Sequence, residues 1–376
     1  MIYFDNSATT FPDLDIMEIY TDTAIKYFAN PSSAHRLGAK ASIILEQARK
    51  RAADCLGVQD NEIVFTSGGT ESNNMALKGL AGKAKKGHII TSVIEHASIF
   101  ETCKQLEQSG FDVTYVETDS SGHIAVEDVY NAIRPDTIAV SVMYVNSELG
   151  SIQPIQQIGQ LLKDYSQIVF HVDAVQGLGK LPLWPKDWGV DMLSLSSHKF
   201  HSPRGVGLLY VREGIEIDPL LVGGGQERTI RSSTENVAGI VAMSHAMEKQ
   251  MDMLEENIGY LSELRNRLLE GLSKLPGIQL NSSKEDGAPH IINFSNIYMS
   301  SEDLLQALEK RQIYISKSSA CSSKSHKPSR VLLATGMDEE RASRAVRVSL
   351  SHCNTLAEID FFLIALQQIL SKLVYS

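Results

Sequence analysis

A lysine follows a short apolar segment in the middle of the chain. Residues 192–195 (Met-Leu-Ser-Leu) predict a buried strand, and Ser196, His198 and Lys199 come directly after it. A lysine amine in a protected site can form a covalent bond with a carbonyl group of a substrate or cofactor. A lysine beyond a strand is more often a solvated surface charge, so the interpretation depends on the residues that the fold brings beside it.

A carboxylate ends a second predicted strand. Residues 168–172 (Ile-Val-Phe-His-Val) are largely apolar, and Asp173 follows them. Ligands of open α/β sheets bind at the C-terminal ends of the strands. Asp173 could bind a metal there, act as a base, pair with a pyridinium nitrogen or only cap a helix. A lysine at a neighbouring strand end favours the pyridinium pairing, which makes the ring an electron sink.

A glycine turn joins a third strand to a helix. Residues 65–72 read Phe-Thr-Ser-Gly-Gly-Thr-Glu-Ser, and backbone N–H groups at such a helix N-terminus bind phosphate. The segment lacks the Gly-Lys-Ser/Thr of a nucleotide P-loop. Alone, it is more often a plain connection. Together, Thr70, Ser196 and His198 could hold a phosphate monoester.

Two further residues have types suited to chemistry. His96 follows a predicted strand, and although a lone histidine is usually structural, it could stack on a planar cofactor and move protons. Cys321 lies in Ser316-Lys317-Ser318-Ser319-Ala320-Cys321-Ser322-Ser323-Lys324, a polar segment whose lysines favour the reactive thiolate. The other cysteines, Cys55, Cys103 and Cys353, are expected in apolar or helical surroundings, where they would be inert.

Alternating strands and helices are predicted to position these residues. Strands are expected at residues 63–66, 88–91, 113–116, 138–142 and 168–172, with helical patterns between them. This alternation predicts an α/β fold with a largely parallel sheet covered by helices on both faces.

A different order follows in the last third of the chain. Apolar residues from Ile240 to Leu275 form one helical stripe, with a possible break near Gly259. Strands are then expected at 290–297, 313–316 and 345–350, a helix at 302–312 and a polar loop at 316–328. Thr355 and Glu358 form a capping box for a final helix. We therefore expect a large domain at 13–250 and a smaller α+β domain from 1–12 and 251–376.

Composition limits the class of protein. The 376 residues carry a net charge of −10, which argues against a broad nucleic-acid or membrane-surface footprint. The start of the chain has no signal-peptide pattern, so a cytoplasmic protein is expected. The four cysteines are widely spaced without a Cys-x-x-Cys pair, so neither a metal site nor a disulfide framework is predicted.

The motifs, taken together and in order, resemble the cysteine desulfurase family within the fold-type-I pyridoxal-phosphate enzymes, over essentially the whole chain. They are residues 3–10 (YFDNSATT), 30–35 (NPSSAH), 66–73 (TSGGTESN), 95–96 (EH), 171–176 (HVDAVQ), 196–199 (SSHK), 223–228 (GGGQER) and 319–322 (SACS). The chain departs from the family's patterns at Asn146-Ser147-Glu148, at Lys317-Ser318 and at Ser351-His352, where Gly-Arg is usual. The loop around Cys321 resembles the longer loop of the family's class I branch.

The resemblance implies a role for each matching residue. Lys199 would hold pyridoxal 5′-phosphate covalently, His96 would stack on its ring, and Cys321 would receive sulfur. Arg347 would bind the substrate carboxylate. The remaining cofactor-binding residues implied are Gly69, Thr70, Asn146, Asp173, Gln176, Ser196, His198 and, from the neighbouring subunit of a homodimer, Thr234.

The activity implied is conversion of L-cysteine to L-alanine, with a persulfide on Cys321. The sulfur would pass to an acceptor protein, either an iron–sulfur scaffold or a tRNA-thiolating enzyme. A selenocysteine lyase or cysteine C–S lyase would need Lys199 but not Cys321. A cofactor-bound scaffold without turnover is the alternative of another class, against which the intact set of Lys199, Asp173, His96, Cys321 and Arg347 argues.

Overall fold

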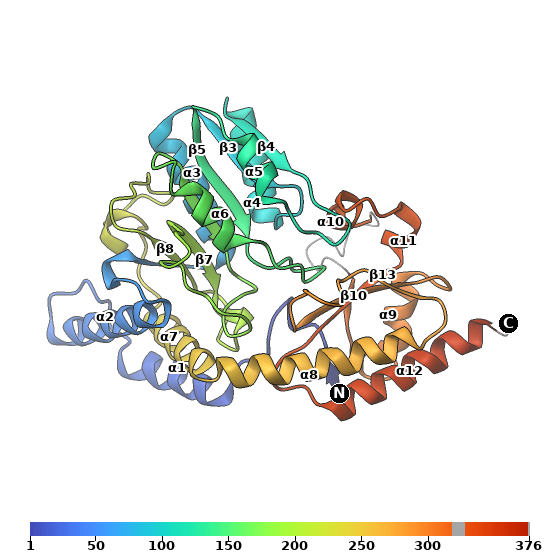
Figure 1. Ribbon diagram of the computed structural model, residues 1–376. Helices are drawn as coiled ribbons and strands as arrows, with labels where there is room; N and C mark the ends of the chain where they lie inside the picture. The colour runs from blue at the N-terminus through green and yellow to red at the C-terminus, as the bar shows by residue number, and fades with distance from the viewer. Residues whose placement is uncertain (318–327, 375–376) are drawn as a thin grey trace.

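The larger part of the molecule is built on a seven-stranded sheet (Figure 1). The structure is a computed structural model that describes residues 1–317 and 328–374. In spatial order the strands are β2 (Ile63–Thr66), β8 (Gly207–Val211), β7 (Met192–Ser196), β6 (Val169–Asp173), β5 (Thr137–Met143), β3 (His88–Ser92) and β4 (Asp112–Val116). Only β8 runs antiparallel to its neighbours. The prediction of a largely parallel sheet is therefore confirmed.

Helices cover this sheet and fix the ends of its strands. They are α1 (Leu14–Lys26), α2 (Arg36–Leu56), α3 (Gly69–Ala84), α4 (Ala97–Gln108), α5 (Val126–Ala132), α6 (Ile155–Leu162) and α7 (Val237–Asp252). Helices α1 and α2 pack on α7, whereas α3 packs on α4 (Figure 1). Two cores result, one formed with α2, α6 and α7 and the other with α3 and α4. Apolar burial of this kind contributes roughly 25 cal/mol per Å².

The remaining part has its own sheet and core. Its four strands lie in the order β12 (Ser316–Lys317), β13 (Ala345–Ser349), β10 (Ile291–Asn296) and β9 (Ile278–Leu280), all antiparallel. The helices are α8 (Leu254–Ser273), α9 (Ser301–Glu309), α10 (Arg330–Ala334), α11 (Glu339–Ser343) and α12 (Leu356–Val374). Figure 1 shows α8 and α12 side by side below this sheet. The predicted capping box is confirmed, since Glu358 N donates to Thr355 Oγ1 and Thr355 N to Glu358 Oε2.

The N-terminus belongs to this second core. Strand β1 (Ile2–Tyr3) pairs in parallel with β11 (Ile313–Tyr314), and the Phe4 ring meets Phe362 of α12 edge to face at 5.8 Å. We propose a domain boundary near residue 250, because the buried side chains of α7 lie in the first core and those of α8 in the second. None of the helices in residues 1–317 and 328–374 is long and apolar enough to cross a membrane.

Two predicted elements are wrong in detail. The stripe from 240 to 275 is interrupted at Met253 (φ −98°, ψ 10°), whereas Gly259 lies inside α8. The apolar stripe indicates which face of the helix is buried. A single non-helical residue at Met253 leaves that face almost unchanged, so the sequence pattern did not locate the break. The strand expected at 313–316 is two strands in different sheets, because the chain turns at Ile315 from β1 to β13.

Candidate active site

Lys199 lies in a short turn that follows β7. The turn, Ser197–Lys199, is a single 3-10 helix, and the Lys199 Nζ donates hydrogen bonds to the carbonyls of Ser7 at 2.6 Å and Ala8 at 2.8 Å. The same N-terminal segment is tied to the turn by Thr10, whose N–H donates to the His198 carbonyl at 2.9 Å. The amine therefore lies half-buried between two segments far apart in the sequence.

Asp173 ends β6, the strand next to β7, and pairs in register with Ser194. Its carboxylate is buried, with 5% of the residue exposed. Oδ2 accepts from Asn73 Nδ2 at 2.7 Å, and Oδ1 accepts from the Val175 N–H at 3.0 Å. These charge-assisted bonds hold the carboxylate in one orientation.

His96 is joined to Asp173 by a chain of hydrogen bonds. Ser98 N donates to His96 Nδ1 at 3.1 Å, and the Ser98 hydroxyl lies 2.7 Å from the same nitrogen. Asn73 Nδ2 donates to both Ser98 Oγ and Asp173 Oδ2. Because Nδ1 accepts, the proton of the neutral imidazole is on Nε2. His96 also caps α4, so its ring is fixed at the helix N-terminus.

Gln176 connects the Asp173 strand end to the N-terminal segment. Its Nε2 donates to the Ser7 carbonyl at 2.9 Å, the oxygen that also accepts from Lys199. Three nearby polar atoms are buried without a hydrogen-bond partner among residues 1–317 and 328–374: Gln176 Oε1, Ser7 Oγ and Asn73 Oδ1. Buried polar groups are normally paired, so these atoms indicate a polar ligand.

The N-terminus of α3 lies against the end of β7. A Cβ atom added at Gly69 would come within 2.7 Å of Val175 and 3.4 Å of Ser196, so a larger residue does not fit. Thr70 is exposed in this first turn. His198 Nδ1 lies 3.2 Å from Thr9 Oγ1, and burial with the charge of Lys199 lowers the His198 pKa to about 3. Helix N–H groups, Ser196 and a neutral His198 thus provide donors suited to an anion.

Arg347 lies in the middle of β13 and is almost completely buried. Its guanidinium donates to the Ser147 carbonyl at 2.9 Å and to Asp5 Oδ1 at 2.8 Å. Ser316 of β12 pairs with Arg347 in register. The segment that carries Cys321 therefore begins one residue beyond a strand fixed beside Arg347. Cys321 itself lies outside the described residues.

Two of the residues predicted to bind the cofactor, Asn146 and Thr234, lie in surroundings unlike those of the others. Asn146 is fully buried, and its side chain bonds to protein groups: it donates to the Ile94 carbonyl and accepts from the N–H groups of Glu148 and Leu149. Thr234 is exposed. Two ion pairs anchor the segment before it. Glu227 accepts from Arg49 at 2.7 and 2.8 Å in a buried pair, and Arg231 donates to Glu71 in a half-buried pair.

Sequence reasoning assigned no role to Asn73 or Lys180. Asn73 orients both Asp173 and Ser98, and only its place in the motif at 66–73 marked it. Lys180 Nζ donates to the Lys199 carbonyl at 2.8 Å. Complete burial and the charge of Lys199 lower the Lys180 pKa to about 7. Lys180 lies on a turn between strands, and no sequence pattern signals that it is buried.

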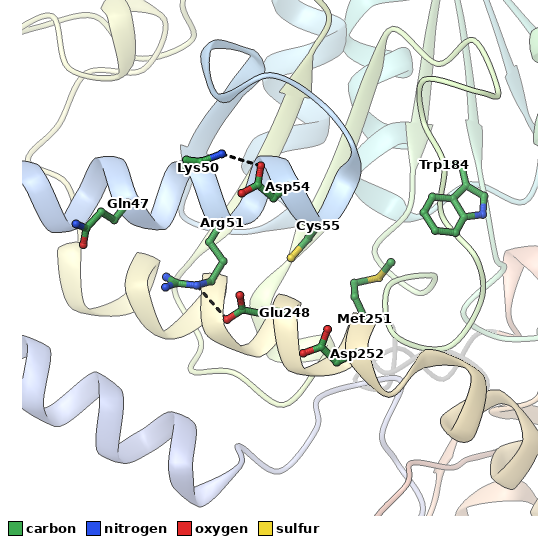
Figure 2. Close-up of a pocket in the computed structure, with 9 residues that line it drawn as sticks. All are labelled: Gln47, Lys50, Arg51, Asp54, Cys55, Trp184, Glu248, Met251 and Asp252. Atoms are coloured by element: carbon green, nitrogen blue, oxygen red, sulfur yellow. Dashed lines mark hydrogen bonds and ion pairs between the residues drawn. The ribbon is translucent and has the colours of Figure 1, made fainter.

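The pocket drawn in Figure 2 contains none of the predicted site residues. It measures about 620 Å³ and is lined mainly by α2 and α7, with ion pairs from Lys50 to Asp54 and from Arg51 to Glu248. Burial and nearby carboxylates raise the pKa of its Cys55 to about 12, so this thiol stays protonated.

The other described cysteines differ in exposure. Cys103 is buried, and burial also raises its pKa to about 12. Cys353, however, is exposed in a turn, so the expectation of apolar or helical surroundings is wrong for it.

Comparison with known proteins gives the chain a family. The family "Aminotransferase class-V" matches residues 2–362. Cysteine desulfurase IscS of Methanosarcina thermophila is 45% identical over 99% of this chain and 92% of its own length. The NifS/IcsS protein homolog of Lactobacillus delbrueckii subsp. bulgaricus is 46% identical over 98% and 97%. The chain belongs to the class-V aminotransferases, among the cysteine desulfurases.

Solved structures agree with this placement. A NifS-like protein has a TM-score of 0.93 and 39% identity over 99% of this chain and 100% of its own. SspA in complex with cysteine has a TM-score of 0.80 and 38% identity over 93% and 99%. The predictions of family and fold are therefore confirmed.

The cofactor of this family is pyridoxal 5′-phosphate, and the residues present fit it. Lys199 would supply the amine, and Asp173 would supply a buried carboxylate at the end of a neighbouring strand. The orphaned Gln176 Oε1 and Ser7 Oγ offer buried polar groups, and the N-terminus of α3, which begins at Gly69, offers backbone N–H groups suited to a phosphate. The prediction of this cofactor from the sequence is confirmed.

Proposed function

We propose that the protein is a cysteine desulfurase that converts L-cysteine to L-alanine and leaves the sulfur as a persulfide on Cys321. The observation that carries the proposal is the placement of Lys199 and Asp173 at the ends of the neighbouring strands β7 and β6, with His96 linked to Asp173 through Ser98 and Asn73. A relative named cysteine desulfurase, which is 45% identical, supports the same chemistry. The net reaction is L-cysteine plus the Cys321 thiol giving L-alanine plus the Cys321 persulfide, so no external oxidant is needed.

Each residue has a defined task in this proposal. Pyridoxal phosphate supplies the electron sink for the carbon that loses its proton. Lys199 would remove and return that proton, and Asp173, oriented by Asn73, would pair with the ring nitrogen. His96 would carry the proton of its neutral ring on Nε2, because Nδ1 accepts from the Ser98 N–H, and this side of the ring is proposed to move protons. The thiolate of Cys321 attacks the substrate sulfur, and the carbon–sulfur bond breaks.

Arg347 is proposed to bind the carboxylate of L-cysteine. Arg347→Leu should raise KM roughly tenfold to a hundredfold, because a hydrogen bond to a charged group contributes about 1.5–3 kcal/mol. Cofactor occupancy should change little. Steady-state alanine production measures this, with cofactor absorbance recorded in parallel.

Asp5 provides the matched control for this prediction. Asp5→Asn removes the charge of the Asp5 carboxylate that Arg347 contacts but keeps the guanidinium. We expect no rise in KM for Asp5→Asn, since the variant retains the group that is proposed to bind the substrate carboxylate. A KM for Arg347→Leu equal to that of the wild type would contradict the assignment.

We also propose a homodimer that shares its active sites. Thr234 is exposed in its own chain, and the same part of the fold exposes Phe11, Leu14, Ile25 and Phe28 by 62–73%. Large exposed apolar side chains grouped near α1 suit a subunit interface. Thr234 would then reach the cofactor phosphate of the partner subunit.

Mixed dimers test this arrangement. Thr234→Val should weaken cofactor binding roughly tenfold to a hundredfold, if it removes a hydrogen bond to a charged phosphate. When Thr234→Val protein is mixed with Lys199→Ala protein, the mixture should regain activity. In each mixed dimer, one site combines the intact Lys199 of one subunit with the intact Thr234 of the other. Absence of any regain, with mixed dimers verified by mass spectrometry, would place Thr234 outside the partner's site.

The sulfur acceptor is proposed to be a protein, either an iron–sulfur scaffold or a tRNA-thiolating enzyme. A persulfide passes its sulfur to another thiol by an exchange like that of disulfides, which also suits the reduced cytoplasm proposed as its location. Transfer of labelled sulfur from the loaded enzyme to each candidate distinguishes the two. Sulfide release at full rate without any acceptor or Cys321 would favour the lyase alternative.

A further inference from the structure

Four side chains with metal-binding atoms meet beside the Lys199 turn. They are Asp13, His201, His352 and Cys353, and one ligand atom of each lies within 4.8 Å of all the others. Asp13 precedes α1, His201 follows Lys199 by two residues, and His352 and Cys353 lie between β13 and α12. We propose that these residues form a binding site for a divalent transition metal of the zinc class.

The separations suit a metal better than direct hydrogen bonds. Asp13 Oδ1 lies 3.9 Å from His352 Nε2, and one ligand atom of each residue in the cluster lies within 4.8 Å of the others. The distance from Asp13 Oδ1 to His352 Nε2 exceeds the roughly 2.7–3.2 Å of a hydrogen bond. Zinc bonds of about 2.0–2.3 Å in a tetrahedron place ligand atoms roughly 3.3–3.7 Å apart. Small side-chain movements therefore bring the ligands to coordination distance.

Neighbouring groups orient two of the ligands. His201 Nδ1 lies 2.8 Å from the Phe11 carbonyl, so the neutral ring carries its proton there and has its lone pair on Nε2. A metal-bound histidine usually donates its other N–H to such a carbonyl. Lys249 Nζ lies 2.8 Å from Asp13 Oδ2 and also bonds Asp15. The lysine thus holds the second carboxylate oxygen, while Oδ1 faces the two imidazoles.

Charge and access also fit a divalent ion. Aspartate and a cysteine thiolate carry two negative charges, and the two histidines bind as neutral rings. Binding releases the Cys353 thiol proton to solvent as the sulfur–metal bond forms. His201 is buried, His352 is half-buried, and Cys353 is exposed, so the site has a closed inner side and an open outer side.

The ligand set and geometry select zinc over harder ions. Imidazole and thiolate favour zinc, whereas calcium and magnesium require oxygen ligands. The sequence predicted no metal site, because it offered no cysteine pair and the four ligands come from three distant segments. A bound ion would link the N-terminal segment, the Lys199 turn and the segment that follows Arg347.

Zinc titration of the cofactor-loaded protein tests the proposal. The Cys321→Ser variant serves as background, so that the proposed catalytic thiol does not bind zinc. Competition with a chromophoric chelator, together with metal analysis after dialysis, should give one zinc per chain with a submicromolar dissociation constant. The thermal midpoint of unfolding should rise with zinc.

Substitutions at the accessible ligands locate the ion. Cys353→Ser and His352→Gln, each in this background, should weaken zinc binding at least about 100-fold, beyond the 10–100-fold typical of outer-shell changes. Cys55→Ser and His245→Gln, at a cysteine and a histidine outside the cluster, should leave it unchanged. Cofactor absorbance verifies that each variant is folded.

Cobalt(II) supplies a readout of the coordination itself. Its visible d–d bands, at wavelengths longer than those of the cofactor, should show tetrahedral geometry and should change in Cys353→Ser. Zinc binding that is weaker than micromolar, or equally tight in Cys353→Ser and His352→Gln, would overturn the proposal. Octahedral cobalt spectra in all variants would do the same.

Discussion

Lys199→Ala is expected to reduce turnover of L-cysteine by at least about 10²–10⁴-fold, the range for loss of a positioned acid–base group alone. The variant loses both the amine proposed to hold the cofactor and the group proposed to move the substrate proton. After borohydride reduction and digestion, wild-type protein should carry the cofactor on the peptide containing Lys199. The variant should carry none there.

The position of the reduced cofactor in Lys199→Ala also tests whether Lys180 can replace Lys199. Its pKa of about 7 leaves part of the amine neutral at physiological pH, and it already contacts the Lys199 carbonyl. Cofactor attached to Lys180 in Lys199→Ala would show that the buried amine can substitute. Lys163→Ala, at an exposed lysine, is the control and should behave as the wild type. Wild-type turnover by Lys199→Ala would contradict the assignment.

Cys321→Ser should abolish sulfur release while the cofactor stays bound. A serine hydroxyl does not form an anion at neutral pH and cannot hold a persulfide. Addition of L-cysteine should still change the cofactor absorbance, because Lys199, Asp173, His96 and Arg347 are intact. Alanine production should fall by about two orders of magnitude or more, at or above the lower end of the 10²–10⁴-fold range for loss of one catalytic group.

The other cysteines provide controls for this variant. Cys103→Ser and Cys55→Ser should retain activity, because burial raises the pKa of both thiols to about 12 and keeps them unreactive. Sulfide or selenide release by Cys321→Ser at the wild-type rate would favour the lyase alternative. Cys353 is exposed and could accept sulfur in place of Cys321. The double variant Cys321→Ser, Cys353→Ser shows whether any sulfur release left in Cys321→Ser passes through the Cys353 thiol.

Residues at strand ends could be placed from the sequence because parallel strands end at one edge of a sheet. Lys199 and Asp173 follow β7 and β6, which are neighbours, and short apolar runs marked both strands. Gly69 and Thr70 follow β2 in the same way. The family resemblance added the roles of these residues, which periodicity alone left open.

Tertiary contacts were not predictable from local patterns. The interruption at Met253 leaves the apolar stripe in phase, so periodicity extends across it. Lys180 reads as a surface charge, and its burial depends on packing beneath the Lys199 turn. The Asp13, His201, His352 and Cys353 cluster combines three segments, and no spacing within one segment indicates it.

Mass spectrometry of the protein after brief exposure to L-cysteine tests directly whether Cys321 receives the sulfur. We expect one added sulfur atom on the peptide spanning residues 318–324, removed by a reducing thiol, together with one alanine per sulfur. We expect no such addition on peptides that contain Cys55, Cys103 or Cys353. Alanine formation with the thiol of Cys321 unmodified throughout the first turnover would show that Cys321 is not the sulfur acceptor.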